Sequence, residues 1–326
     1  MKFDIGDFIR RMGDTHSSGH KPMRIIKDAK FRQHRKFWGS IPSTHVAGRY
    51  HDDIPEWKGP GRYDWWFSDN KQKWIRNLKY RKEVLDENNW IVGNDDPLQV
   101  KYIMNKYGLR HDGSFNRYRD VRGGVVWLGD STVFGTGLNL EDTYTYIAHH
   151  SYDKFKGLPY INMGFPGSGI ETQYRILKVH LDKLQPKYVI HQFPWAFTRA
   201  EHYVPFWDTF NNTSASRELQ YIEEEEHEKT KVYKADRMLQ LLSTPSGILR
   251  YNVNLDALKW ICHDINAIFL SIEEDMADPD KEYLVGKFDN NHDNFARDLS
   301  HGGIDTNLYN SEVLKEVLEY CLNKYY

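Results

Sequence analysis

Cysteine is scarce in this chain: Cys262 and Cys321 are the only two among 326 residues. Two thiols cannot supply a disulfide framework or a cysteine-rich metal site. We therefore expect a fold held together by its hydrophobic core, with no metal and no other cofactor.

Long apolar runs are absent as well. No stretch approaches the roughly 18 consecutive apolar residues of a membrane-spanning helix. The first residues, Met1–Asp7, lack the apolar segment of a signal peptide. The mean hydropathy is −0.73, yet 40% of the residues are hydrophobic, which is enough to build a core at this length. We expect a globular protein with no membrane span and no signal peptide, located in the cytoplasm.

Charge divides the chain into two parts. Residues 1–120 carry 24 Lys and Arg against 16 Asp and Glu, a net charge of +8, whereas residues 121–326 carry 20 against 30, a net charge of −10. The basic part also holds six of the ten tryptophans. Such asymmetry predicts segments that dock on each other or that bind different partners. We expect residues 1–100 to form a basic, Trp-rich N-terminal extension.

One stretch of this extension, residues 71–82, has the pattern of an amphipathic basic helix, with Trp74, Ile75 and Leu78 on its apolar face. A helix of this kind can bind nucleic acid or an anionic surface. We favour a helix that packs on the rest of the protein, and we expect no nucleic-acid partner.

The most informative local motif is an apolar run, Val125–Leu128, that ends in Gly129-Asp130-Ser131. A strand covered on both faces of a sheet reads as a continuous hydrophobic run, and open α/β sheets bind ligands at the carboxyl ends of their strands. Ser131 is therefore expected where chemistry usually takes place. Its backbone N–H, at the start of the next helix, can face a developing negative charge.

A second motif, near the C-terminus, places Asp298 three residues before His301 and just ahead of a helix-like segment, 310–324. Within one turn of chain, the carboxylate can hold one imidazole N–H and leave the other nitrogen free as a base. His292 is close in sequence but lacks a carboxylate at this spacing. We therefore favour His301 as the base.

The order of elements from residue 121 onward predicts a parallel sheet with helices on both faces, because strands and helices alternate. One strand, around 160–164, runs into a glycine-rich loop that permits close backbone approach to a substrate oxygen. An insertion at about 196–247 interrupts the alternation. Because it follows the carboxyl end of a strand, we expect it to overhang the site as a lid.

Together these motifs resemble the SGNH (GDSL-type) hydrolase superfamily over residues 101–326. The resemblance implies a three-layer α/β/α fold with a flavodoxin-like parallel sheet. It also implies that Ser131 is the nucleophile and that Asp298 and His301 complete a catalytic triad. In the same way, the backbone N–H groups of Ser131 and Gly164 would bind the oxyanion.

The resemblance fails at one block, because the stretch Tyr188–Trp195 contains no Asn that could serve as a further oxyanion donor. We expect Gln192 to replace it, with the indole of Trp195 as an alternative donor. A buried structural amide remains the other interpretation of Gln192. Further substrate contacts are expected from residues that flank the motifs, namely Asp130, Asn162, Phe165 and Trp195.

These observations lead to two hypotheses for the function. The first is a serine esterase that hydrolyses an acyl ester, such as an O-acetyl group on a carbohydrate or a small molecule; an acyltransferase would use the same triad. The second is a catalytically weakened binding or structural module with the same fold. The missing Asn and the basic extension favour the second, and the Lys-, Asn- and Tyr-rich composition is similar to that of bacteriophage particle proteins, which would make the protein virion-associated.

Overall fold

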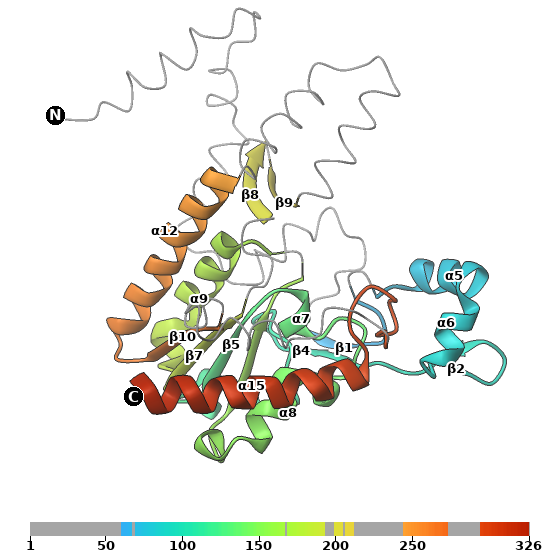
Figure 1. Ribbon diagram of the computed structural model, residues 1–326, viewed down its shortest axis with the longest axis horizontal. Helices are drawn as coiled ribbons and strands as arrows, with labels where there is room; N and C mark the ends of the chain where they lie inside the picture. The colour runs from blue at the N-terminus through green and yellow to red at the C-terminus, as the bar shows by residue number, and fades with distance from the viewer. Residues whose placement is uncertain are drawn as a thin grey trace, which may run out of the picture.

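A four-stranded parallel sheet lies at the centre of the protein, with strand order β10-β7-β5-β6 (Figure 1). The computed structural model describes residues 60–66, 69–166, 168–192, 199–204, 206–211, 244–272 and 294–325. Numbered along the chain, the sheet strands follow the order 4-3-1-2, which is the flavodoxin-like order 2-1-3-4 read from the other edge. The strands are β5 (Val125–Gly129), β6 (Tyr160–Gly164), β7 (Tyr188–Gln192) and β10 (Ile268–Ser271).

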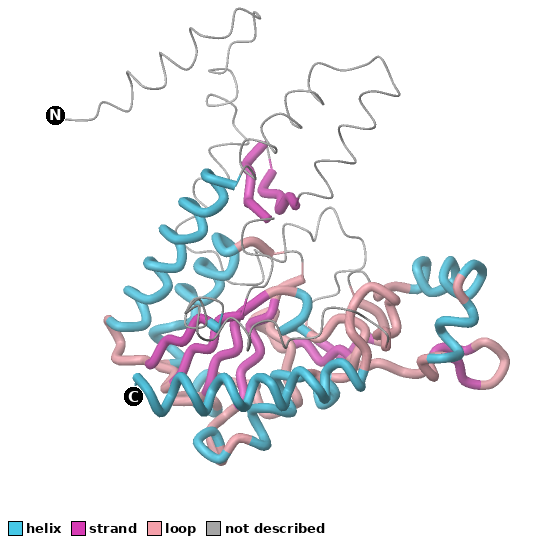
Figure 2. Tube along the Cα trace, in the orientation of Figure 1, coloured by secondary structure: helices cyan, strands magenta, loops and turns pink. Residues whose placement is uncertain are grey.

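Helices cover both faces of this sheet, so the predicted three-layer arrangement is confirmed (Figure 2). One face packs against α9 (Ile170–Leu184) and α12 (Thr244–His263), and the other against α8 (Tyr144–Ser151) and α15 (Ile304–Tyr325). Every residue of β5, β6 and β7 is buried, as expected for strands covered on both sides.

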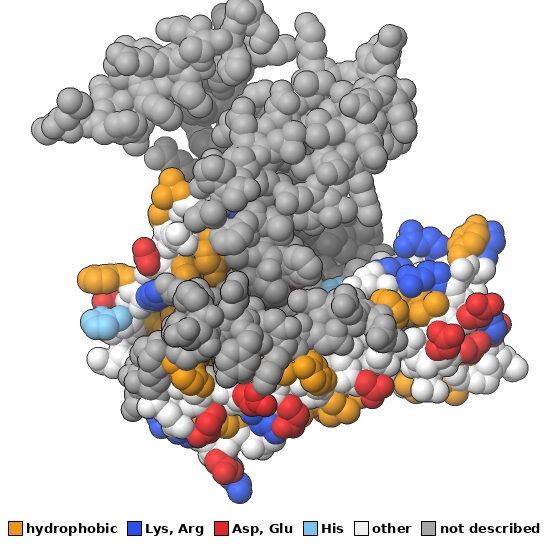
Figure 3. Space-filling view, viewed as in Figure 1, with side chains coloured by type: hydrophobic (Ala, Val, Ile, Leu, Met, Phe, Trp, Pro, Cys, Tyr) orange, Lys and Arg blue, Asp and Glu red, His pale blue; other side chains and the backbone are white. Residues whose placement is uncertain are grey.

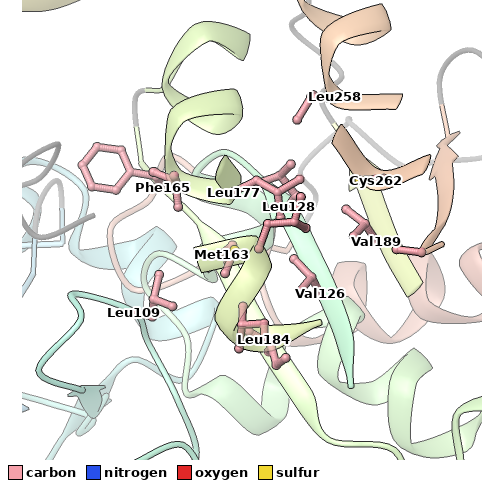
Figure 4. Close-up of a cluster of buried hydrophobic side chains, with 14 of the residues drawn as sticks. Leu109, Val126, Leu128, Met163, Phe165, Leu177, Leu184, Val189, Leu258 and Cys262 are labelled. Atoms are coloured by element: carbon pink, nitrogen blue, oxygen red, sulfur yellow. The ribbon is translucent and has the colours of Figure 1, made fainter. Parts of the chain in front are cut away.

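Side chains of the central strand alternate between the two layers. Val126 and Leu128 of β5 join the core with α9 and α12 (Figure 4), whereas Val125 and Trp127 join the core with α8 and α15. The two cysteines are free and buried, Cys262 in the first core and Cys321 in the second. They therefore pack as small apolar residues on opposite faces of the sheet.

The described part of the N-terminal extension is folded onto this domain. Its elements are β1 (Gly61–Tyr63), α5 (Lys71–Tyr80), α6 (Lys82–Glu87), β2 (Ile91–Val92) and β3 (Asp96–Pro97). Strand β1 pairs with β4 (Tyr102–Met104), which follows the extension. A third core joins Trp66, Trp74 and Trp90 to Phe134 and Leu299, which come from the two motif segments. The extension thus shares a hydrophobic core with the segments that carry the predicted chemistry.

The helix predicted at 71–82 is present as α5, but it ends at Tyr80, and after Arg81 a second helix, α6, begins at Lys82. Trp74 is buried as expected, whereas Ile75 is 55% exposed, so its predicted place on the packed face is wrong. The reason is helical geometry. The buried residues of α5 are Trp74 and Asn77, which are three positions apart and lie on one face of the helix, whereas Ile75 points away from that face. Lys and Arg side chains gather over α5 in the space-filling view (Figure 3).

Within the predicted insertion, the structure describes one antiparallel hairpin, β8 (Arg199–Val204) with β9 (Phe206–Asn211), and the start of α12. The other residues of 196–247 lie outside the described part of the chain, so the lid remains a prediction. Short helical turns complete the fold: η1 (Tyr118–Asp120), α7 (Ser131–Phe134), η2 (Leu140–Asp142) and η3 (Asp153–Phe155). Among the described helices, none has the length and apolar character needed to cross a membrane.

Candidate active site

Three neighbouring strands end at the same level, and this alignment builds the site. Gly129, the last residue of β5, is in register with Gly164 at the end of β6 and with Gln192 at the end of β7. The carboxyl ends of parallel strands therefore bring Ser131, the start of the glycine-rich loop and Gln192 to one edge of the sheet.

The serine turn, residues 129–131, leads directly from β5 into α7. Asp130 caps this short helix: its Oδ1 accepts the Thr132 N–H at 2.9 Å and the Thr132 hydroxyl at 2.8 Å. A Cβ at position 129 would lie 2.4 Å from the carbonyl oxygen of Gln192, so only glycine fits against the neighbouring strand. Ser131 is 6% exposed, and within the described residues its hydroxyl makes no hydrogen bond.

Asp130, which we expected to contact substrate, has a structural role in this conformation. Its side chain is fully buried and is engaged in capping α7. Helix capping satisfies N–H groups that would otherwise have no partner.

The second motif lies in the histidine loop, residues 294–303, ahead of α15. Nδ1 of His301 lies 2.8 Å from Oδ2 of Asp298. The other carboxylate oxygen, Oδ1, accepts the backbone N–H groups of Ser300 at 3.0 Å and of His301 at 3.2 Å. Because a carboxylate only accepts hydrogen bonds, Nδ1 carries the proton and Nε2 is left as the basic nitrogen.

Electrostatics within this pair favour an ionised carboxylate and a basic imidazole. Burial alone would raise the pKa of Asp298, but His301, Lys73 and the Ser300 N–H together hold that pKa well below its usual range. Burial lowers the pKa of His301, but Asp298 more than offsets this and raises it above its ordinary value. Asp130 of the serine turn acts on the pKa of His301 in the same direction as Asp298.

The serine and histidine segments meet through the post-serine loop, residues 135–138. The backbone N–H of Arg297 donates to the carbonyl of Gly137 at 3.1 Å. Gly137 has a φ of +82°, and a Cβ there would lie 2.8 Å from the Cβ of Ala296. No hydrogen bond joins the Ser131 hydroxyl to His301 in the described part of the chain. The structure thus pairs Asp298 with His301 and brings Ser131 into their neighbourhood.

The N-terminal segment holds the histidine loop, a contribution that the sequence analysis missed. Lys73 Nζ lies 3.3 Å from Oδ2 of Asp298, the Asn77 amide donates to the Asp298 carbonyl at 3.3 Å, and Arg81 donates to the Leu299 carbonyl at 3.3 Å. These three polar residues recur every fourth position along α5 and its C-cap, which places them on one helix face. That spacing was the available signal.

A buried ion pair adds a second connection between distant segments. Arg297 pairs with Asp69 at 2.7 Å, and the Tyr102 hydroxyl donates to the same carboxylate at 2.6 Å. The Tyr102 oxygen in turn accepts the Gly137 N–H at 2.8 Å. This chain of contacts joins the extension, the histidine loop and the post-serine loop.

The expected role of Gly164 in the oxyanion site stays a prediction, and in this structure its backbone N–H has another partner. Its N–H donates to Oδ1 of Asn162 at 2.9 Å and is therefore not directed at a substrate. Asn162, which we expected to contact substrate, is buried, and its Nδ2 donates to the Val133 carbonyl at 2.8 Å and to the Tyr160 hydroxyl at 3.1 Å. The Asn162 side chain therefore connects β6 to α7 by a hydrogen bond.

Phe165, another expected substrate contact, directly follows β6. It is buried in the core that α9 forms with the sheet (Figure 4), and its N–H donates to the Gly129 carbonyl at 2.9 Å. An aromatic ring gains more from burial against apolar neighbours than from exposure to solvent. Trp195, the remaining expected contact, lies outside the described residues.

Gln192 keeps the position predicted for a donor. It is 8% exposed at the end of β7, and its Oε1 is buried with no hydrogen-bond partner among the described residues. Buried amide groups are normally hydrogen-bonded, so the unpartnered oxygen sets Gln192 apart from a fully satisfied structural amide. Its role as an oxyanion donor stays a prediction, because that role belongs to Nε2.

A buried histidine beside this amide is engaged in structure. His191 Nε2 lies 2.8 Å from Oε1 of Gln173, whose amide donates to the Ser168 hydroxyl at 3.2 Å. Burial lowers the pKa of His191 to about 3, so its imidazole is neutral. The described residues contain no cluster of three or more His, Cys, Asp or Glu side chains that could hold a metal ion.

Comparisons with known proteins give distant likenesses. No family model and no curated protein matches the chain. Among solved structures, the chain is similar to the psychrotrophic esterase EstA from Pseudoalteromonas sp., with 16% identity over 62% of this chain and 100% of that one and a TM-score of 0.29. It is also similar to a catalytic mutant of Axe2, an acetylxylan esterase from Geobacillus stearothermophilus, with 12% identity, 60% and 94% coverage and a TM-score of 0.28.

A third similar structure is a member of the lipolytic protein G-D-S-L family from Veillonella parvula, with 10% identity, 62% and 98% coverage and a TM-score of 0.29. Likenesses at this level decide neither the reaction nor the substrate. The chemistry therefore has to be inferred from the residues of the site.

Proposed function

We propose that this protein is a serine ester hydrolase in which Ser131 is the nucleophile, His301 the base and Asp298 the group that orients the base. The observation that carries the proposal is the part-buried Asp298–His301 hydrogen bond of 2.8 Å, in a loop bonded to the one that follows the serine turn at the carboxyl edge of the sheet. A nucleophile, a base and an orienting carboxylate are the parts that acyl transfer needs.

The reaction proceeds in two steps. Nε2 of His301 takes the proton of the Ser131 hydroxyl as Oγ attacks the ester carbonyl, and it returns that proton to the departing alcohol. Water then attacks the acyl-enzyme with His301 again as base, which releases the acid and regenerates Ser131. The Ser131 N–H and the Gln192 amide would bind the oxyanion in both steps.

For the substrate we propose an acetyl ester on a carbohydrate. The support comes from the sequence after β7, which is rich in aromatic residues: Trp195, Phe197, Tyr203, Phe206, Trp207 and Phe210. Aromatic rings present flat apolar faces that suit the C–H faces of sugars. We propose acetyl as the acyl group because it is the acyl group that carbohydrates most commonly carry as an ester.

The experiment that tests the proposal is covalent labelling with a fluorophosphonate, which reacts with activated serines. We expect the parent protein and a Ser114→Ala control, which alters an exposed serine, to be labelled at Ser131. Ser131→Ala should not be labelled and should not hydrolyse a small activated acetate, while its melting temperature stays close to the parent value because the lost hydroxyl makes little contact.

The second candidate function is a binding or structural module that keeps the fold with a weakened site. Two observations favour it: the Ser131 hydroxyl is not hydrogen-bonded to His301, and the Gly164 N–H is already engaged by Asn162. In that case the parent would remain unlabelled although it is folded, and acetylated oligosaccharides would bind without being hydrolysed.

A further inference from the structure

Lys73, a residue of the N-terminal segment, makes direct contact with the predicted triad. Its Nζ lies 3.3 Å from Oδ2 of Asp298, the same oxygen that pairs with His301. Nζ also donates to the Ser300 hydroxyl at 2.5 Å. Lysine therefore bridges two residues of the histidine loop across 225 positions of sequence.

This contact is built into the fold and is not a chance surface pairing. The Lys73 side chain is 17% exposed and that of Asp298 is not exposed at all. The helix that carries Lys73 is fixed to the same loop by Asn77 and Arg81, and Trp74 anchors it in the shared core. An ion pair held this way loses little conformational freedom and is poorly screened by solvent.

We propose that Lys73 is a positioning residue of the triad, which holds the Asp298 carboxylate toward His301 and offsets part of that carboxylate's negative charge. The inference rests on the proposed triad, since Lys73 acts through Asp298 and touches no reacting atom. It also gives part of the N-terminal extension a role in catalysis.

The charges around His301 explain the direction of this effect. Asp298 of its own loop and Asp130 of the serine turn both favour the protonated imidazole, whereas Lys73 of α5 and burial oppose it. Of the other nearby cations, Arg297 is paired with Asp69, and Arg81 is bonded to the Leu299 carbonyl. A positive charge at Lys73 thus offsets part of the pull that two carboxylates exert on the proton.

The test compares Lys73→Met, which keeps the aliphatic stem, with Lys73→Arg, which keeps the charge. Lys71→Met is the matched control, because Lys71 is an exposed lysine on the same helix. The His301 titration is followed directly by NMR of its ring protons, with His301→Gln to assign the signal. In parallel, kcat/KM for a small activated acetate is measured from pH 4 to 9.

We expect the His301 titration of Lys73→Met to move to higher pH, while Lys73→Arg and Lys71→Met titrate like the parent. On the acid side of the activity profile, kcat/KM of Lys73→Met should fall about three- to ten-fold, because a shift of the His301 pKa by one unit lowers kcat/KM tenfold on that limb. The change on the alkaline plateau should be smaller. A merely structural contact would lower the plateau and leave the titration in place.

An unchanged His301 titration in Lys73→Met, or a shift to lower pH, overturns the inference. If Lys73→Met melts too low to study, Lys73→Gln, which retains a hydrogen-bond donor without the charge, has to show the same upward shift. A shifted titration in a protein that lacks esterase activity would reject the proposed function and leave the coupling of Lys73 to His301 standing. An active enzyme without the shift would reject the coupling alone.

Discussion

The N–H of Arg297 donates to the carbonyl of Gly137 at 3.1 Å, and this single backbone bond ties the loop that follows Ser131 to the loop that carries Asp298 and His301. The side chain of Arg297 is simultaneously paired with Asp69 of the N-terminal segment. Three parts of the chain, each distant in sequence, are therefore fixed to one another next to the proposed active site.

Removal of the Arg297 guanidinium should destabilise the protein strongly. Arg297→Met leaves the buried Asp69 carboxylate without its cation, and such a loss costs about 3–5 kcal/mol of unfolding free energy. Urea denaturation followed by tryptophan fluorescence measures this. Arg117→Met, which breaks an exposed pair with Asp120, is the control and should cost less than about 1 kcal/mol. Equal losses in the two variants would contradict the structural role given to the buried pair.

Activity should depend on pH through His301. The reactive base is the neutral imidazole, and the pKa of His301 is raised by Asp298, so kcat/KM should fall as pH drops through a value above the ordinary pKa of histidine. Asp298→Asn removes the charge that raises the pKa, so the acid limb should move to lower pH while the plateau falls by about 10³- to 10⁴-fold. A pH–rate profile for each protein checks both statements.

The choice of base is tested by substitution. His301→Gln should abolish hydrolysis, whereas His263→Gln, at an exposed position on α12, should leave kcat/KM unchanged. His292→Gln should also retain activity. Loss of activity in His292→Gln together with retention in His301→Gln would transfer the role of base to His292.

Gln192 is expected to act in the transition state. Gln192→Ala should lower kcat by about a hundred-fold or more with little change in KM, because the hydrogen bond strengthens only as the oxyanion forms. Its unfolding free energy should change little, since the amide oxygen makes no hydrogen bond within the described residues. Steady-state kinetics and urea denaturation separate this outcome from the alternative, in which stability falls and kcat is unchanged.

The N-terminal segment should be required for folding of the rest. A chain of residues 101–326 lacks Trp66, Trp74 and Trp90, which leaves Phe134 and Leu299 of the shared core uncovered. We expect that chain to aggregate or to melt without cooperativity, whereas residues 60–326 should remain soluble with a cooperative transition. Differential scanning calorimetry and size-exclusion chromatography measure the comparison. A soluble, active 101–326 protein would contradict this expectation.

Much of the fold could be predicted because its signals are local. The buried strand β5 is a continuous apolar run, the serine turn begins with a glycine that its neighbours require, and Asp298 and His301 are three residues apart in one loop. Strand–helix alternation then leads to a parallel sheet whose strand ends share one edge. Each of these steps depends on residues close together in the sequence.

The roles of individual polar side chains could not be predicted in the same way. Asp130 and Asn162 were expected to contact substrate. In the structure, Asp130 accepts a hydrogen bond from Thr132, and Asn162 donates hydrogen bonds to Val133 and Tyr160. Which partner a polar group finds depends on what packs over it. The flanking sequence does not specify that packing.

The sequence by itself determined the order of the elements, the strand that delivers Ser131 and the pairing of Asp298 with His301, because period, turn chemistry and short spacing act within a few residues. Only the tertiary structure decided that Lys73 of the basic extension reaches Asp298, and that Asp69 neutralises Arg297 beside it. These contacts join residues more than 200 positions apart, and their existence depends on the packing of a shared core around Trp74 and Leu299. Spacing along a chain carries no information about contacts of that range.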